Sequence, residues 1–176
     1  MNIFILNSGR CGSSSFIQAC QHISNYSSAH ESRSHLTGRA RIIYPDNHIE
    51  ADNRLSWLLG RLDQQYGDAA FYVHLIRDSS ATASSFEKRS QFGIMRAYRE
   101  GILLNAAKKI TDREIALDYL DTVDANIQCF LKDKSRKLTM RLENIQEDFK
   151  KFWQQVGAQG NLAEALNGWQ IHHNAS

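Results

Sequence analysis

A cation and a run of hydroxyls lie in a glycine-rich segment near the start of the chain, Ser8-Gly9-Arg10-Cys11-Gly12-Ser13-Ser14-Ser15. Glycines let a backbone approach an anion closely, and successive backbone N–H groups in such a turn point at the anion's oxygens. A helix that begins at the turn adds the positive end of its dipole. Arg10 adds a formal charge. These residue types and their spacing predict a site for a phosphate-like group.

The elements on either side of this turn are those of a phosphate-binding loop. Ile3–Leu6 is an apolar run that predicts a buried strand, and Phe16, Ile17, Cys20 and Ile23 recur at the spacing of one helix face. Strand, loop and helix alone are common in α/β proteins that bind nothing at this turn. The nucleoside-triphosphate pattern G-x-x-x-x-G-K-[ST] is absent, and so is the dinucleotide pattern G-x-G-x-x-G. The loop therefore carries Arg where an NTPase carries Lys.

This loop resembles the 5′-phosphosulfate loop of the sulfotransferases that use 3′-phosphoadenosine 5′-phosphosulfate (PAPS) as sulfuryl donor. A second segment supports the resemblance: Phe71–Ile76 predicts a strand, Arg77 ends it, and Ser85 follows eight positions later. This spacing is similar to the family's 3′-phosphate motif, although Ser79 stands where the family usually has Pro. The resemblance implies that the donor is bound by Gly9, Arg10, Cys11, Gly12, Ser13, Ser14, Arg77 and Ser85.

The resemblance also implies the fold. We expect an α/β protein, three-layered α/β/α with a central parallel sheet and a P-loop NTPase-like sulfotransferase core, in one domain over residues 1–176. Lys137–Leu142 predicts a later core strand with a helix after it, and Thr111-Asp112-Arg113-Glu114 has the form of a capping box before a long helix. Apolar residues over Glu50–Tyr66 predict another helix, which Gly67 would end.

The residues that follow the first predicted helix are polar and without sustained periodicity, from 24 to 49. In sulfotransferases the base that deprotonates the acceptor is a His or Glu of this region. The resemblance implies Glu31 as the base, with His30 as the alternative, and Arg10 as the group that stabilises the transition state. A solvated loop with incidental charges is the competing interpretation. Ile42–Tyr44 has the apolar character of a short strand.

Composition restricts the partners. With 42% hydrophobic and 23% charged residues, one proline and a net charge of +2, the chain resembles an ordinary globular protein, and its dispersed basic residues do not favour nucleic acid. No apolar stretch approaches the ~18 residues of a membrane span. Met1-Asn2 leads directly into the first strand, so we expect a cytoplasmic protein. The cysteines Cys11, Cys20 and Cys129 lack metal-binding spacing, and we expect no metal.

The C-terminal segment departs from the family. Many sulfotransferases close the 3′-phosphate site with a basic, glycine-containing loop near this end, but here no Lys or Arg follows Lys151. Either His172 and His173 contribute or the contact is missing. The chain is also short for the family, so we expect the elements that cover the acceptor to be reduced, or to come from a second subunit in a homodimer.

Three functions remain open. The first is a sulfotransferase that moves a sulfuryl group from PAPS to an unidentified hydroxyl or amine acceptor. The second is a module that binds PAPS or its desulfated product, 3′-phosphoadenosine 5′-phosphate (PAP), without catalysis. The third is a nucleotide kinase-like P-loop enzyme, against which stand the absent Lys and the absent magnesium-binding hydroxyl. Nothing in the sequence identifies the acceptor. Glu87–Gly93 is a basic, polar stretch of the kind usually found on a solvated surface, although the resemblance implies that this region can border the acceptor site.

Overall fold

One parallel sheet organises the computed structural model, which describes residues 1–105 and 109–172, with side chains up to Trp169. Its strands within these residues are β1 (Ile3–Leu6), β2 (Ser27–His30), β3 (His48–Ala51), β4 (Phe71–Ile76) and β5 (Lys137–Arg141). They pair in the order β2-β3-β1-β4-β5, and every pair is parallel. All carboxyl ends therefore meet at one edge of the sheet.

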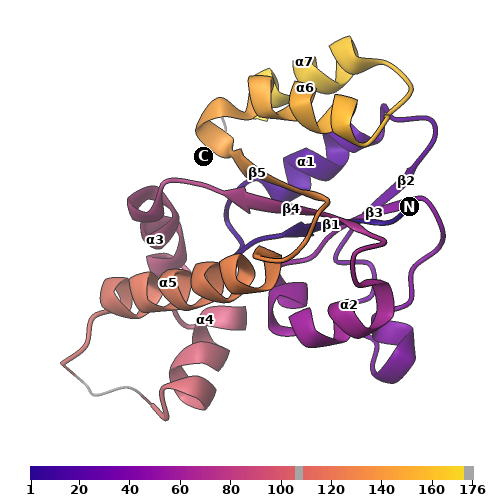
Figure 1. Ribbon diagram of the computed structural model, residues 1–176. Helices are drawn as coiled ribbons and strands as arrows, with labels where there is room; N and C mark the ends of the chain where they lie inside the picture. The colour runs from indigo at the N-terminus through magenta and orange to yellow at the C-terminus, as the bar shows by residue number, and fades with distance from the viewer. Residues whose placement is uncertain (106–108, 173–176) are drawn as a thin grey trace.

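Helices cover both faces of the sheet (Figure 1). One layer holds α1 (Ser13–Cys20), α6 (Ile145–Gln155) and α7 (Leu162–His172). The other holds α2 (Leu59–Tyr66), α3 (Ser79–Glu87), α4 (Gly93–Ala97) and α5 (Asp112–Leu131). Short 3₁₀ turns, η1 (Gly38–Arg41), η2 (Asn53–Trp57) and η4 (Leu142–Asn144), and a π-helical turn, η3 (Tyr98–Ile102), connect them. The predicted three-layer α/β/α architecture is confirmed.

The apolar run of β1 follows from its position at the centre of the sheet. Ile3 and Ile5 pack into the hydrophobic cluster under α1 and α6, whereas Phe4 and Leu6 pack into the cluster under α5. A central parallel strand is buried on both faces and therefore shows no polar alternation. The predicted capping box is also present, since Thr111 and Glu114 bond each other's backbone N–H at the start of α5.

Two predictions between α1 and β4 are wrong. Ile42–Tyr44 is no strand but follows the 3₁₀ turn η1, and the strands of this region are β2 and β3. The helix expected over Glu50–Tyr66 is split into the end of β3, η2 and the shorter α2, although it does end at Gly67. The failure to predict β3 has a physical cause. Strand β3 buries His48 and Glu50 by pairing them with each other, so its sequence lacks the apolar pattern that predicts a strand.

The order of the strands marks the place for a ligand. The chain leaves β1 towards β2 and β3 on one side and then continues to β4 and β5 on the other. In open α/β sheets, ligands bind outside the carboxyl ends of the strands where the order reverses. The loop after β1 lies at this point. Within the described residues, none of the helices combines the length and apolarity that a membrane crossing requires.

Candidate functional site

The loop between β1 and α1 is shaped by backbone in the left-handed region. Gly9 (φ +94°), Arg10 (φ +59°) and Gly12 (φ +87°) all have positive φ. The first helical bond of α1 runs from the Phe16 N–H to the Gly12 carbonyl, at 2.9 Å. The N–H groups of Ser13, Ser14 and Ser15 at the start of α1 therefore donate to no backbone carbonyl among the described residues. This geometry supplies the free N–H donors that an anion needs.

Two of these positions leave little room for a side chain. A Cβ atom at Gly12 would lie 2.8 Å from Cδ1 of Leu142, and one at Gly9 would lie 3.2 Å from Nδ2 of Asn53. Both glycines also need the positive φ that residues with a Cβ rarely adopt. The sequence thus has glycine where close packing and backbone conformation both require it.

Neighbouring elements hold the loop in place. The hydroxyl of Tyr119, buried on α5, donates to the Ser8 carbonyl at 2.7 Å, and Ser56 on η2 donates to the Asn7 carbonyl at 2.9 Å. The Gly9 N–H donates to the Asn7 side chain at 2.9 Å. These groups use the carbonyls before the loop, so its shape is set before any ligand arrives. Cys11 points inwards and contributes only its backbone, because its side chain is buried.

Arg10, Arg77 and Ser85, three of the predicted donor-binding residues, lie together. Arg10 Nε donates to Ser85 Oγ at 2.8 Å, and Arg77 Nη1 donates to the Arg10 carbonyl at 3.3 Å. Arg77 follows β4 and Ser85 lies on α3, so three separate elements supply this group. Among the described residues, neither Arg10 nor Arg77 forms an ion pair with a carboxylate. Such a cluster of unneutralised guanidinium groups favours a polyanionic ligand.

Arg89 is a cation of this site that the sequence did not reveal. It lines the same cavity as Arg10. The pKa of the Arg10 guanidinium is lowered mainly by its own burial, and further by the positive charges of Arg89 and Arg77. Arg89 belongs to the basic stretch Glu87–Gly93, for which the sequence predicts a solvated surface or the border of the acceptor site but no contact with the donor. Its spacing of four from Ser85, one helical turn, was the only available signal. A bound anion would relieve the repulsion among these cations.

His30 and Glu31 face the loop from the end of β2. His30 Nε2 lies 3.0 Å from Ser13 Oγ and 3.4 Å from Ser14 Oγ. Glu31 has a positive φ of +51°, and its carboxylate pairs with Arg54 Nη1 at 2.9 Å. Both residues line a cavity of about 260 Å³ that Arg10 also lines. The structure therefore brings the predicted base candidates and the predicted anion loop to one cavity.

Two buried carboxylates on and after β3 hold the surroundings of this cavity. Glu50, with no exposed surface, accepts 2.7 Å bonds from the Ser32 N–H and hydroxyl and lies 3.0 Å from His48 Nε2. Asp52, equally buried, pairs with Arg41 at 2.5 Å and accepts the Arg54 N–H at 2.8 Å. Glu50 thus fixes the turn that follows Glu31, and Asp52 fixes the segment that carries Arg54.

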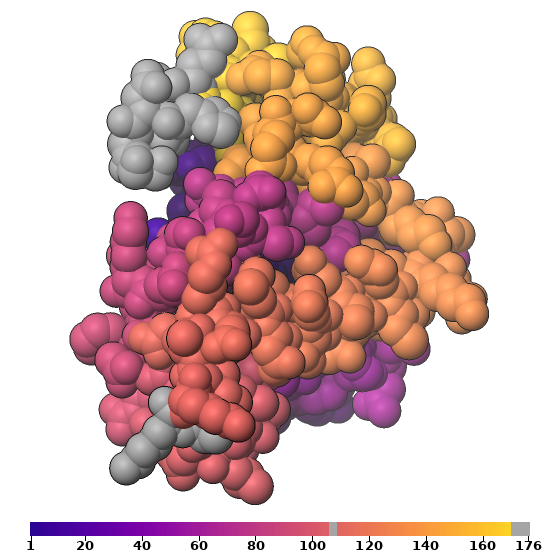
Figure 2. Space-filling model, turned by 90° about the vertical axis from the view of Figure 1, so that its left-hand side faces the viewer, coloured from indigo at the N-terminus to yellow at the C-terminus, as the bar shows by residue number. Residues whose placement is uncertain are grey.

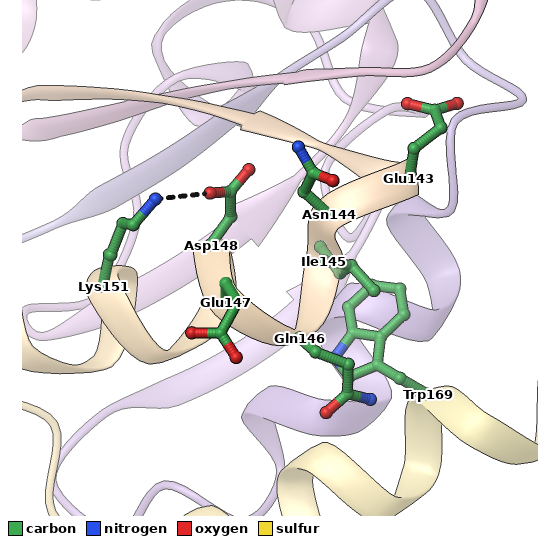
Figure 3. Close-up of a pocket in the computed structure, with 8 residues that line it drawn as sticks. All are labelled: Glu143, Asn144, Ile145, Gln146, Glu147, Asp148, Lys151 and Trp169. Carbon is green, nitrogen blue, oxygen red and sulfur yellow. Dashed lines mark hydrogen bonds and ion pairs between the residues drawn. The ribbon is translucent and has the colours of Figure 1, made fainter.

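A larger cavity of about 670 Å³ lies beside η4 and the start of α6. Figure 3 shows its lining: Glu143, Asn144, Ile145, Gln146, Glu147, Asp148, Lys151 and Trp169. Glu143 accepts the Asp78 N–H at 2.8 Å, which joins this cavity to the Arg77 segment. The ion pair of Asp148 with Lys151 measures 3.0 Å. Trp169 is buried, and its indole N–H has no partner among the described residues.

One sequence prediction cannot be placed. The segment expected to close the 3′-phosphate site includes His172 and His173, and the side chains of both lie outside the described residues. Across residues 1–105 and 109–169, no three His, Cys, Asp or Glu side chains are grouped as the ligands of a metal ion would be.

Comparison with solved structures identifies the fold. A sulfotransferase domain from the curacin biosynthetic pathway is similar with a TM-score of 0.64 and 15% identity, over 94% of this chain and 76% of that chain. The chain has a sulfotransferase-like fold. Mouse sulfotransferase SULT7A1, solved in complex with PAP, is similar with a TM-score of 0.59 and 15% identity, over 99% of this chain and 68% of that chain. No family model and no curated protein matches the sequence.

Proposed function

We propose that this protein is a sulfotransferase that moves a sulfuryl group from PAPS to a hydroxyl or amine. The observation that carries the proposal is the convergence of the loop, Arg10, Arg77 and Ser85 at the carboxyl edge of the sheet, with His30 and Glu31 across the same cavity. The sulfotransferase-like fold supports it, as does the PAP bound to one structural neighbour.

In the proposed donor complex each part of the nucleotide meets a different element. The 5′-phosphosulfate lies on the N–H groups at the start of α1, with Arg10 and Arg89 beside it. The 3′-phosphate lies between Arg77 and Ser85. The adenine ring occupies the larger cavity, which begins at Glu143 beside Asp78. The arginines neutralise much of the donor's charge, so the transfer needs no metal.

Transfer breaks the bond between sulfur and the bridging oxygen of the 5′-phosphate and forms a bond from sulfur to the acceptor atom. The acceptor's proton passes to a base, and PAP leaves. Charge that develops on the bridging and sulfuryl oxygens is stabilised by Arg10 and the loop N–H groups, which are in place before the reaction. Preorganised donors of this kind lower the barrier by several kcal/mol, or about 10²–10³ in rate.

Glu31 is the proposed base, and His30 is the alternative. Each reaches the cavity, but they differ in their partners: Glu31 pairs with Arg54, whereas His30 contacts the hydroxyls of Ser13 and Ser14. General base catalysis contributes roughly 10²–10⁴ in rate. Glu31→Gln and His30→Gln, compared at saturating acceptor, separate the two. Normal turnover in Glu31→Gln would transfer the role to His30.

Selection for a 3′-phosphate is the test that does not require the acceptor. PAP should bind at least about tenfold to a hundredfold more tightly than AMP, because truncating one partner of a desolvated charge contact costs roughly 2–5 kcal/mol. Titration calorimetry of wild type, Arg77→Ala and Ser85→Ala with both nucleotides measures this preference. It should disappear in Arg77→Ala and shrink in Ser85→Ala. Arg136→Ala, at the opposite edge of the sheet, is the matched control and should bind like wild type.

Equal affinity of wild type for PAP and AMP would overturn the proposal. A module that binds PAP without catalysis would show the preference for PAP over AMP. It would give no sulfated product when the protein and PAPS are incubated with an extract of the protein's own host. A kinase-like enzyme would instead hydrolyse or transfer from ATP in the presence of magnesium.

A further inference from the structure

Exposed apolar side chains are concentrated in one part of the molecule, here named the α4 lobe: residues 88–105 and 109–110, which comprise α4, η3 and the chain on either side of them. Four of the six large hydrophobic side chains that are exposed among the described residues belong to it: Phe92 (72%), Ile102 (56%), Leu104 (82%) and Ile110 (40%). Figure 1 shows the lobe beyond α5, on the side away from the sheet, and in Figure 2 it forms the lower end of the face in view.

The helical geometry of the lobe explains why Ile102 is exposed. Met95 and Tyr98 are buried against the core cluster under α5. After Tyr98 the helix continues as the π-helical turn η3, in which the Leu103 N–H donates to the Tyr98 carbonyl at 2.9 Å. In an α-helix the fourth residue after Tyr98 would lie on the same face, but the wider turn brings the fifth residue there. Leu103 therefore packs against the core cluster, and Ile102 faces the solvent.

Leu104 is exposed on a backbone that does not favour leucine. It follows the last helical residue with φ +48°, a left-handed conformation that Gly or Asn usually adopts at this position. Asn105 continues with φ +62°. The fold gains no burial from this side chain, so Leu104 is covered only when a partner binds the lobe.

Basic residues are interspersed with these apolar residues. Five of the six charged residues in the lobe are basic: Lys88, Arg89, Arg96, Arg99 and Lys109. With Glu100 as the sixth, the lobe carries +4, whereas the whole chain carries only +2. Arg96 pairs with Glu100, and Arg99 pairs with Asp112. Lys88 and Lys109 form no ion pair with any carboxylate of the described residues.

We propose that the α4 lobe docks the protein on a membrane surface that contains anionic lipids. This inference does not depend on the proposed function. Exposed apolar side chains of a surface helix insert at the boundary between headgroups and acyl chains, and adjacent Lys and Arg side chains are attracted to anionic headgroups. A second copy of the chain fits the lobe less well, because a two-fold contact would place +4 against +4.

Sedimentation of the full chain with lipid vesicles measures this interaction. Vesicles of phosphatidylcholine and phosphatidylserine should bind the protein at least about tenfold more tightly than vesicles of phosphatidylcholine alone. The preference should largely disappear in about 1 M NaCl, where the Debye length is about 3 Å. Leu104→Ser should weaken binding about tenfold, because one inserted side chain is lost. Lys109→Gln should weaken it about fivefold.

The matched controls lie outside the lobe. Ile43 is 37% exposed, so Ile43→Ser removes a comparable apolar side chain elsewhere on the surface. Lys132 is an exposed lysine at the opposite end of α5 from the lobe, so Lys132→Gln removes the same charge at a distance. Both variants should bind the anionic vesicles like wild type.

A fluorescent label that brightens in apolar surroundings tests which part of the molecule meets the lipid. The label is attached to Leu104→Cys in a Cys129→Ser background, in which the two remaining thiols are buried. It should brighten when the vesicles that contain phosphatidylserine are added. The same label on Ile43→Cys in the same background should not respond.

Equal binding to the two kinds of vesicle, or binding that Leu104→Ser leaves unchanged, would overturn the inference. So would a label that brightens equally at positions 43 and 104. A dimer in analytical ultracentrifugation that Leu104→Ser dissociates, without any binding to vesicles, would also overturn it and would assign the lobe to a second copy of the chain.

Discussion

The two sides of the candidate site hold their shape by different means. On the donor side, backbone geometry dominates: positive φ at Gly9, Arg10 and Gly12 and bonds to the carbonyls of Asn7 and Ser8 set the loop. On the side proposed to hold the acceptor, Glu50 holds the turn after β2 and Asp52 holds the segment that carries Arg54, and neither carboxylate has exposed surface. A backbone-shaped loop depends on a few glycines, whereas a turn held by buried charge depends on every partner remaining in place.

The largest effect is expected where a buried charge loses its partner. Asp52→Ala leaves the guanidinium of Arg41, itself only 4% exposed, without its counter-ion. Breaking such a pair typically costs about 3–5 kcal/mol of folding free energy. Urea unfolding followed by circular dichroism measures the loss. Asp46→Ala, an exposed carboxylate in the same segment, should change stability little. Similar losses in both variants would show that the acceptor side does not depend on buried charge.

On the donor side the largest effect should fall on turnover. If the proposed function holds, Arg10→Ala lowers kcat by about 10²–10³, because the guanidinium acts on charge that develops during transfer. PAP carries no sulfuryl group, so its affinity should fall by less than about tenfold. Rates with PAPS and calorimetry with PAP measure the two quantities. Equal losses would make Arg10 a general anchor for the nucleotide.

The contrast explains which half of the site the sequence could predict. The donor loop was located from local signals, since glycines, hydroxyls and Arg10 are adjacent in the chain, and Arg77 follows an obvious apolar strand. Strands β2 and β3 were missed because neither shows an apolar pattern: the residues of β2 are exposed or half-buried, and β3 buries His48 and Glu50, which pair with each other at 3.0 Å. Arg54 and Arg89 belong to no motif that assigns them a contact with the ligand. Only the folded chain brings them to the cavity.

A third prediction separates the turn from the nucleotide site. Glu50→Gln keeps the size of the side chain but removes the charge that accepts two bonds from Ser32. Hydrogen bonds to a charged group contribute about 1.5–3 kcal/mol. The turn that carries His30 and Glu31 should loosen, so kcat should fall about tenfold while PAP affinity stays constant. Glu50→Asp, which keeps the charge, should recover part of the rate. A matching loss of PAP affinity would show that the two sides are not independent.

The glycine dependence of the donor side is tested at Gly12. An alanine there places Cβ 2.8 Å from Leu142 Cδ1 at a φ of +87°. Overpacking of this size costs roughly 1–3 kcal/mol of folding free energy, and Gly12→Ala should therefore distort the loop and weaken PAP binding. Gly38→Ala is the control for backbone strain alone, since Gly38 has φ +55° and no atom within 4 Å of the added Cβ. Adding Leu142→Ala to Gly12→Ala should restore PAP binding in part. If Leu142→Ala gives no rescue, backbone strain at position 12, not the contact with Leu142, causes the loss.

The smallest effect concerns Cys11, a loop residue whose side chain is buried. Burial raises the pKa of its thiol to about 12, and the thiolate is the reactive form. Iodoacetamide at pH 8 should therefore modify the exposed Cys129 and spare Cys11 and Cys20, as peptide mass spectrometry would show. In the unfolded chain a thiol ionises near ~8.5, so the stabilisation from this buried thiol is complete below that pH. It is lost as the pH rises towards 12, because the unfolded chain then binds fewer protons than the folded one. Between pH 8 and pH 10, wild type should lose more stability than Cys11→Ala. Labelling of Cys11 as fast as Cys129 would show that the loop opens readily, and that the donor side is less preformed than its backbone geometry indicates.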